Sequence, residues 1–220
     1  MRSIDTSTPL QVGVALYDNF EMLDTFGPLE MFSMLGAERC QITMLSETGG
    51  LKAAAMGASG AFGPKVDSQE FSNSSELDVL LVPGGFGTFV ELENPTYLDF
   101  LKARAGDTPI IASVCTGSAL LAKAGLLDGL PATSNKQFFD LARAQSGNTE
   151  WREAARWVDA GQMWTSSGVS AGTDMTLAIL ANLYGTAEAE QAAIAAEWNW
   201  HRDADTDPFT EHLNALMGAL

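Results

Sequence analysis

The chain has 220 residues, of which 46% are apolar and 18% are charged, and this length suits one domain with a single sizeable core. Its 12 basic and 28 acidic residues give a formal net charge of -16. A surface this negative repels phosphate backbones and anionic lipids, so we expect neither a nucleic-acid partner nor a membrane partner.

The beginning of the chain carries no sign of export. Its first ten residues, MRSIDTSTPL, contain no apolar stretch that could serve as a signal peptide, and no run of about 18 apolar residues follows. The two cysteines, Cys40 and Cys115, provide no disulfide framework in a chain of this size. We therefore expect a cytoplasmic protein.

The first half of the chain predicts alternating strands and helices. Short apolar runs indicate buried strands at residues 11–17, 40–45, 78–83 and 110–114. Helical spacing predicts helices over 24–35, over 95–105 and after Cys115. Asn94 and Pro95 supply an N-cap and a first turn for the second of these helices. The small residues and glycines of 51–63 indicate a hairpin or an irregular crossover.

The second half continues the alternation. The pattern predicts a short strand in 130–135, a helix over 136–145 and two strands within 155–167 joined by Asp-Ala-Gly. Two helices follow, over 170–185 and 186–200, each opened by a Ser or Thr that can cap it. This order of elements predicts an α/β fold with a mainly parallel sheet. Sites in such folds lie at the carboxyl ends of the strands, which here means the turns 18–24, 83–88 and 113–117.

Cys115 stands between the strand IIASV and the helix that begins with TGSALL. Free cysteines are most often small buried hydrophobes, and we interpret Cys40 in that way. At a strand-to-helix turn, a cysteine can instead be a nucleophile on a tight elbow. The amides and the dipole of the following helix would stabilise its thiolate. The sequence alone leaves both interpretations of Cys115 open.

Two other motifs resemble a dinucleotide-binding loop and a calcium-binding loop, but neither matches the full pattern. The loop 83–88 (PGGFGT) resembles a dinucleotide fingerprint, but Val90 replaces its third glycine, and the exposed amides of a Gly-Gly turn better suit an oxyanion site. Residues 202–214 place three aspartates at calcium-loop spacing, but Pro208 and Asn214 occupy the positions that need glycine and glutamate. His201 and His212 match no zinc spacing. We predict no metal and no cofactor.

The acidic residues Glu21 and Asp24 flank the first predicted strand-to-helix turn, at the same sheet edge as Cys115. Asp24 can be an ordinary helix N-cap. A carboxyl group beside a thiolate would instead be driven toward its protonated form and could donate a proton.

Four segments, in one order along the chain, resemble the ThiJ/PfpI branch of the class I glutamine amidotransferase-like superfamily. They are FEMLDTFGPLEMF, DVLLVPGGFGT, VCTGSALLAKAGLLDG and WTSSGVSAGTDMTLAIL. The resemblance implies a flavodoxin-like three-layer sandwich, a homodimer, and one domain over 1–220 with a core of about 11–200 and a C-terminal extension over 201–220. It also implies that Cys115 is the catalytic cysteine, that Asp24 is its acidic partner, and that the amides of Gly85 and Thr116 form the oxyanion or substrate-binding site.

Departures from the family pattern narrow the expected chemistry. Protease-like members have a histidine where this chain has Thr116, and many relatives have a histidine where it has Asn135. Cys-Thr at the elbow together with the aspartate of LDTFGP looks most like the isocyanide hydratase subgroup. Regulators with an added helix-turn-helix domain share this elbow, but the chain is too acidic for DNA and leaves little room for that domain.

Three hypotheses share Cys115. The leading one is a hydratase or lyase that acts on a small electrophilic substrate, such as an isocyanide, with Cys115 as nucleophile and Asp24 as general acid and base. The second is a redox sensor or stress-response protein, in which a low-pKa exposed thiol is oxidised to a sulfinate. The third is a glyoxalase-type activity on small dicarbonyls.

Overall fold

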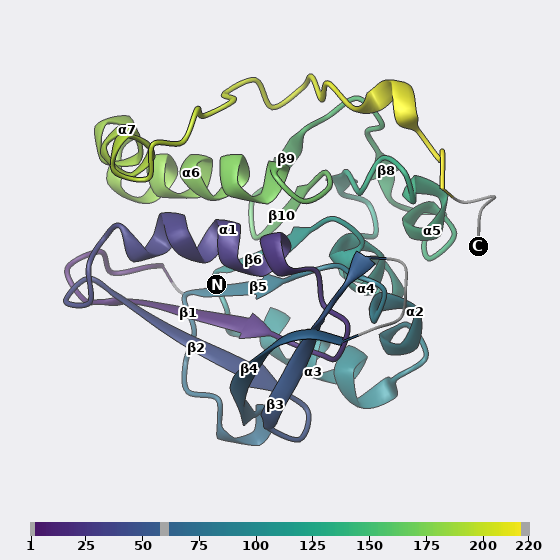
Figure 1. The fold of residues 1–220 in the computed structure, drawn as a ribbon, viewed down its shortest axis with the longest axis horizontal. Helices are drawn as coiled ribbons and strands as arrows, with labels where there is room; N and C mark the ends of the chain where they lie inside the picture. Colours follow the sequence, from purple (N-terminus) through teal and green to yellow (C-terminus); the bar gives the residue numbers. More distant parts are fainter. Residues whose placement is uncertain (1–2, 58–61, 217–220) are drawn as a thin grey trace.

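A computed structural model describes residues 3–57 and 62–216, which form an eight-stranded sheet flanked by helices (Figure 1). The strand order is β3-β4-β2-β1-β5-β6-β10-β9. These strands are β1 (Leu10–Ala15), β2 (Cys40–Ser46), β3 (Gly50–Ala55), β4 (Phe62–Glu70), β5 (Val79–Val82), β6 (Ile110–Val114), β9 (Trp157–Ala160) and β10 (Met163–Ser166). Only the outer pairs β3–β4 and β9–β10 are antiparallel. The expected α/β fold with a mainly parallel sheet is confirmed.

Two groups of helices flank the sheet. The elements are α1 (Met22–Ser33), α2 (Thr88–Glu91), α3 (Pro95–Ala105), α4 (Gly117–Lys123), α5 (Phe139–Arg143), α6 (Ala171–Tyr184) and α7 (Thr186–Ala195), with short 3-10 turns η2 (Phe71–Asn73) and η3 (Thr210–His212). Helix α6 packs against α1 and α7, whereas α4 contacts α2, α3 and α5. A small parallel pair, β7 (Pro131–Ala132) and β8 (Glu150–Trp151), lies outside the main sheet. Among the described residues, no helix is long and apolar enough to cross a membrane.

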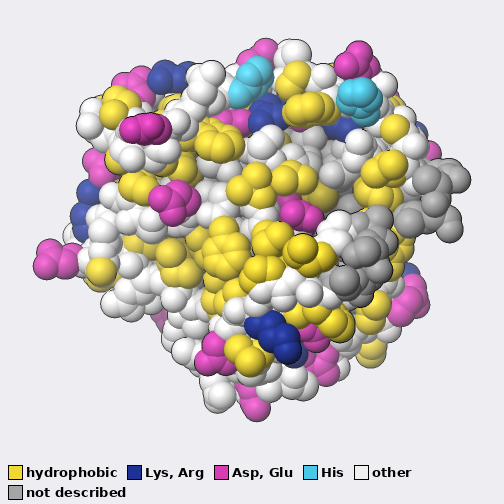
Figure 2. Space-filling model, viewed as in Figure 1, with side chains coloured by type: hydrophobic (Ala, Val, Ile, Leu, Met, Phe, Trp, Pro, Cys, Tyr) yellow, Lys and Arg dark blue, Asp and Glu magenta, His cyan; other side chains and the backbone are white. Residues whose placement is uncertain are grey.

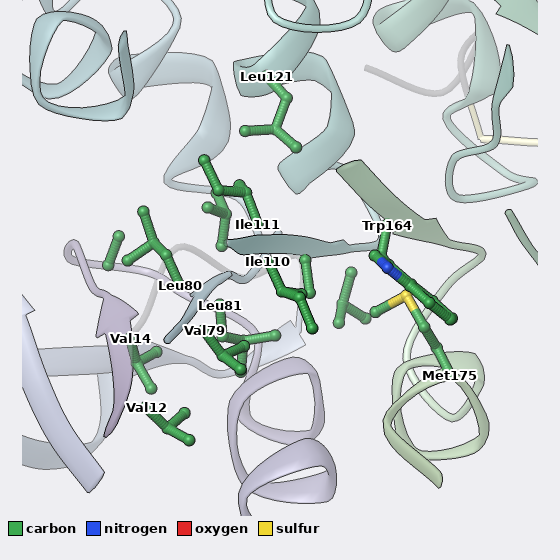
Figure 3. Packing of buried hydrophobic residues seen from close by; sticks show 14 of the residues in the cluster. Val12, Val14, Val79, Leu80, Leu81, Ile110, Ile111, Leu121, Trp164 and Met175 are labelled. Atoms are coloured by element: carbon green, nitrogen blue, oxygen red, sulfur yellow. The ribbon is translucent and has the colours of Figure 1, made fainter. Parts of the chain in front are cut away.

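The centre of the sheet is buried on both faces, as short apolar strands require. Every residue of β5 and β6 is buried. Leu80 pairs with Ile111, and Figure 3 shows Ile111 directed toward Leu121 of α4. The neighbouring residue Ile110 is directed to the opposite face, which α1 and α6 cover (Figure 3). This packing holds the carboxyl ends of β1, β5 and β6 side by side at one edge of the sheet, where the site lies.

Several predicted elements appear as expected. The Asn94 side chain accepts hydrogen bonds from the amides of Thr96 and Tyr97, so the predicted N-cap of α3 is confirmed. The strands β9 and β10 form the predicted hairpin. The strands β3 and β4 also pair as a hairpin, although residues 58–61 of the segment between them lie outside the described part.

Other details of the prediction are wrong. The hydroxyl of Ser170 makes no cap bond with α6, because it accepts a hydrogen bond from Arg156 instead. Helix α7 has Gly185 at its N-cap position, so Thr186 is not a cap, and it ends at Ala195 rather than at 200. The early end follows from Glu197, whose φ of 51° is left-handed and turns the chain out of the helix. The helix predicted over 136–145 is reduced to α5.

Candidate active site

Three loops meet at the carboxyl edge of the sheet, as predicted. They follow β1, β5 and β6, which are neighbours in the sheet. Cys115 lies directly after β6 with a φ of 60°, a left-handed conformation that is rare outside glycine. Gly117 allows the tight turn, because a Cβ atom there would lie 2.2 Å from the Val82 carbonyl oxygen. Cys115 therefore stands on a strained strand-to-helix elbow.

The cysteine side chain is enclosed but borders a cavity. Cys115 is 6% exposed, and its amide donates to the Ser167 carbonyl oxygen at 3.1 Å. The Nδ2 atom of Asn135 donates to the Cys115 sulfur at 3.0 Å. The Oδ1 atom of Asn135 accepts from the amide of Phe138, which fixes the orientation of the side-chain amide. A directed donor is thus aimed at the sulfur.

Asp24 is not the N-cap of α1, because Glu21 occupies that position. Asp24 is fully buried, and its Oδ2 atom accepts a hydrogen bond of 2.9 Å from the Gly84 amide. Its Oδ1 atom has no hydrogen-bond partner within the described residues. Burial raises the pKa of Asp24 to about 8, and the negative charge of Glu21 adds to the rise, against the opposing effects of Gly84, Cys115 and the Val169 amide. This carboxyl group holds its proton at neutral pH.

The thiol is shifted in the same direction. Burial raises the pKa of Cys115, and Asp24 raises it further, while Thr116 and Asn135 work in the opposite direction. The stabilisation expected from the helix N-terminus is therefore outweighed, and the expected low-pKa exposed thiol is not what the structure contains. Because the two groups interact, they titrate as a pair. The pair gives up its first proton near pH 8, the pKa of Asp24.

Gly85 and Thr116 lie together beside the cysteine. The Gly85 amide donates to the Thr116 hydroxyl at 3.1 Å, and that hydroxyl lies 2.8 Å from the Thr88 hydroxyl. Gly85 has a φ of 130°, and a Cβ atom there would lie 2.4 Å from the Asn19 carbonyl oxygen. In this arrangement the Gly85 amide already has a partner within the protein, so a substrate atom would have to share it.

A cavity of about 250 Å³ opens beside Cys115. Its walls include Glu21, Gly85, Phe86, Phe89, Thr116, Asn135, Gln137, Phe138, Val169 and Leu216. Phe138 makes edge-on ring contacts with Phe86 and Phe89, with centroid distances of 6.2 and 6.4 Å. The cavity thus joins a reactive sulfur to an aromatic wall, and it suits a small ligand with an apolar arm.

The two histidines do not join this group. His201 bonds the Thr206 carbonyl oxygen at 3.1 Å, and His212 lines a neighbouring cavity of about 230 Å³ together with Ser170. The described residues contain no cluster of three histidines, cysteines or carboxylates that could hold a metal ion. Sequence reasoning noted Asn135 only as a departure from the family pattern and did not find the aromatic wall.

The chain resembles known proteins in sequence and in fold. A model of the DJ-1/PfpI family matches residues 11–182. Isonitrile hydratase from Pseudomonas putida is 28% identical over 194 residues, which cover 86% of this chain and 78% of that protein. General stress protein 18 from Bacillus subtilis (strain 168) is 31% identical over 124 residues, which cover 56% of this chain and 69% of that protein. The crystal structure of a ThiJ/PfpI family protein from Pseudomonas syringae has a TM-score of 0.76 at 26% identity, covering 99% of this chain and 97% of that one.

Proposed function

Because this chain belongs to the DJ-1/PfpI family, as its motifs predict, we propose that it is a cysteine-dependent hydratase that adds water to a small electrophilic carbon, with an isocyanide as substrate. One observation carries the proposal. A buried carboxyl group with a pKa of about 8, Asp24, lies beside Cys115, and Cys115 borders an apolar cavity from a strained elbow. The similarity to isonitrile hydratase supports the choice of substrate.

The first step uses the pair with one proton, after that proton has passed from the Cys115 thiol to the Asp24 carboxylate. The Cys115 thiolate forms a bond to the terminal carbon of the isocyanide, and protonated Asp24 gives its proton to the same carbon. The product is a thioimidate, R–N=CH–S–Cys115, beside an Asp24 carboxylate. The Asn135 amide, 3.0 Å from the sulfur, stabilises the thiolate before attack.

The second step consumes water. The water oxygen bonds to the thioimidate carbon, one of its protons goes to nitrogen, and the other returns to Asp24. The carbon–sulfur bond then breaks with its electron pair on sulfur. The formamide R–NH–CHO leaves, and the thiolate and protonated Asp24 are restored. The Gly85 amide, which also donates to the Thr116 hydroxyl, would donate a hydrogen bond to the oxygen of this intermediate and orient it.

The cavity wall argues against the two alternative functions. Phe86, Phe89 and Phe138 offer no hydrogen bonds to the two carbonyl groups of a small dicarbonyl, so they favour an apolar arm over a glyoxalase substrate. A redox sensor needs an exposed thiolate, whereas Cys115 is 6% exposed and burial raises its pKa. We therefore favour hydration over both the glyoxalase-type activity and the redox-sensor function.

The direct test is turnover of benzyl isocyanide, followed by the appearance of N-benzylformamide. We expect wild type and Cys40→Ser to form this product, since Cys40 is buried in β2 away from the cavity. Cys115→Ser should lose activity by at least about 1000-fold, in the range of other removed nucleophiles. Undiminished turnover by Cys115→Ser, or no formamide from any small isocyanide, would overturn the proposal.

We also propose that the protein is a cytoplasmic homodimer, as the family resemblance implies. The face in Figure 2 carries apolar side chains across its middle, and α1 on that side exposes Leu23 by 39% and Phe26 by 42%. A contiguous apolar patch, unlike a single exposed apolar residue, is typical of a contact surface. Light scattering after size exclusion should give a mass near twice 23.4 kDa.

A further inference from the structure

The segment after α7, residues 197–216, runs along the outside of the molecule to the Cys115 cavity. We name it the C-terminal strap. Figure 1 shows it in yellow, leaving α7, passing over α6 and reaching the region of α5. It contains one 3-10 turn, η3, and is otherwise irregular. A long irregular segment keeps one path only where specific contacts hold it.

The middle of the strap is held by a buried charge network. The Arg156 amide donates to the Ala204 carbonyl oxygen at 2.7 Å. The guanidinium of Arg156 lies 3.5 Å from the Asp207 carboxylate, and it also binds Asp174 of α6 at 2.6 Å. Asp207 is 4% exposed, so this part of the strap is packed into the fold rather than lying on its surface.

The end of the strap is bonded to the segment that holds the cysteine. The Asn214 amide donates to the Lys136 carbonyl oxygen at 2.7 Å, directly after Asn135. The Asn214 side-chain oxygen accepts from the Asp140 amide at 2.8 Å. Leu216 continues this pairing, because its amide donates to the Gln137 carbonyl oxygen at 3.3 Å. The left-handed φ of 57° at Asn214 suits asparagine and turns the chain at this point.

Leu216 reaches the reactive cavity through these bonds. It lines the same cavity as Cys115, Phe86 and Phe138, and it is 38% exposed, so it stands between the cavity and solvent. We propose that Leu216, held in place by the C-terminal strap, is a specificity-determining residue that limits the length of the apolar arm of the substrate. The choice of an isocyanide rests on the proposed function, but the size limit itself does not.

The test uses maleimides of graded size on Cys115, so it needs no hydratase activity. In a Cys40→Ser background, intact mass measures the rates of adduct formation with N-methylmaleimide and N-benzylmaleimide. Leu216→Ala should raise the benzyl-to-methyl rate ratio about tenfold, since pocket contacts of this size discriminate by that order. Leu216→Trp should lower the ratio below the wild-type value.

Two controls distinguish the effect of side-chain size at position 216 from a general loosening of the protein. Leu216→Met keeps the volume and should keep the wild-type ratio. Leu51→Ala removes a leucine that is 62% exposed on β3 and should also leave the ratio unchanged. An unchanged ratio in Leu216→Ala, or an equal rise for both maleimides, would overturn the proposal. If the ratio shifts as expected while no isocyanide is hydrated, the size limit stands and the proposed function falls.

Discussion

The side-chain amide of Asn135 donates a hydrogen bond of 3.0 Å to the sulfur of Cys115, from a position where many family members are expected to carry a histidine. Asparagine cannot accept a proton from the thiol, but it can stabilise a negative sulfur. Proton transfer in this site therefore falls to Asp24, and the role of Asn135 can be tested separately.

Replacing Asn135 by aspartate removes the donor and keeps an oxygen for the Phe138 amide. We expect the pKa of Cys115 to rise and the rate of isocyanide hydration near pH 8 to fall about ten- to hundredfold, the usual worth of a hydrogen bond to a charged group. Asn148→Asp makes the same charge change at an exposed position and serves as the control. Equal activity in Asn135→Asp and Asn148→Asp would contradict a role for the Asn135 donor.

The pH dependence of Cys115 alkylation reports the coupling to Asp24. In a Cys40→Ser background, the rate should first rise near pH 8, where the pair gives up its first proton. In Asp24→Asn burial still raises the pKa of the thiol, but the carboxylate charge that raises it further in the wild type is gone, so full alkylation should be reached at lower pH than in the wild type. Superimposable profiles for the two proteins would show that Asp24 and Cys115 do not share a proton.

Asp24 should also make stability depend on pH. Its pKa is about 8 in the folded protein and about 3.9 in an unfolded chain, so the folded state binds an extra proton between these values. The contribution of Asp24 to stability is therefore complete below pH 4 and is lost as pH rises toward 8. Asparagine does not titrate, and its side-chain oxygen can still accept from Gly84.

We therefore expect the free energy of unfolding of Asp24→Asn, relative to that of the wild type, to increase by up to about 1.4 kcal/mol for each pH unit between pH 5 and pH 7. Urea denaturation at pH 5, 6, 7 and 8 measures the difference. A constant difference across this range would mean that Asp24 titrates normally in the folded protein.

The loop after β5 depends on the absence of a side chain at Gly85. Gly85→Ala would place a Cβ atom 2.5 Å from the Glu21 amide nitrogen at a φ of 130°. We expect a loss of about 3 kcal/mol or more, because both the steric clash and the backbone strain must be relieved. Gly147→Ala meets no atom within 4 Å and should change stability by less than about 1 kcal/mol. Similar melting temperatures for the two variants would contradict this expectation.

The strands were predictable because buried parallel strands appear as short apolar runs, and β5 and β6 fit this pattern at every position. The position of Cys115 followed directly, since a cysteine between such a strand and a helix has one place in an α/β fold. Asp24 was ambiguous in sequence. Its role depends on where α1 begins, and helix boundaries are set by tertiary contacts that the local sequence does not contain.

The remaining walls of the site come from distant segments. Asn135 lies 20 positions from Cys115 in the chain, and Leu216 approaches only because backbone bonds hold the strap to Lys136 and Gln137. No local periodicity signals such contacts. Helix α7 was predicted too long because the chain turns at Glu197, after which Trp198 donates to the Asp174 carboxylate at 2.8 Å.

Asp174 is the residue on which this end of the fold depends. It is 1% exposed, and its carboxylate accepts from Arg156, Trp198 and the His201 amide. Asp174→Ala would leave the Arg156 charge buried without its main partner. We expect a loss of about 3–5 kcal/mol, as for other buried ion pairs from which one member is removed.

An exposed ion pair provides the matched comparison. Arg39 and Glu188 bind each other at 2.6 Å, but their side chains are 47% and 35% exposed. Glu188→Ala should therefore cost less than about 1 kcal/mol. Urea denaturation followed by tryptophan fluorescence measures both variants, and Trp198 should report an early loss of the strap in Asp174→Ala. Equal costs for the two substitutions would show that the buried network does not hold the C-terminal strap to the fold.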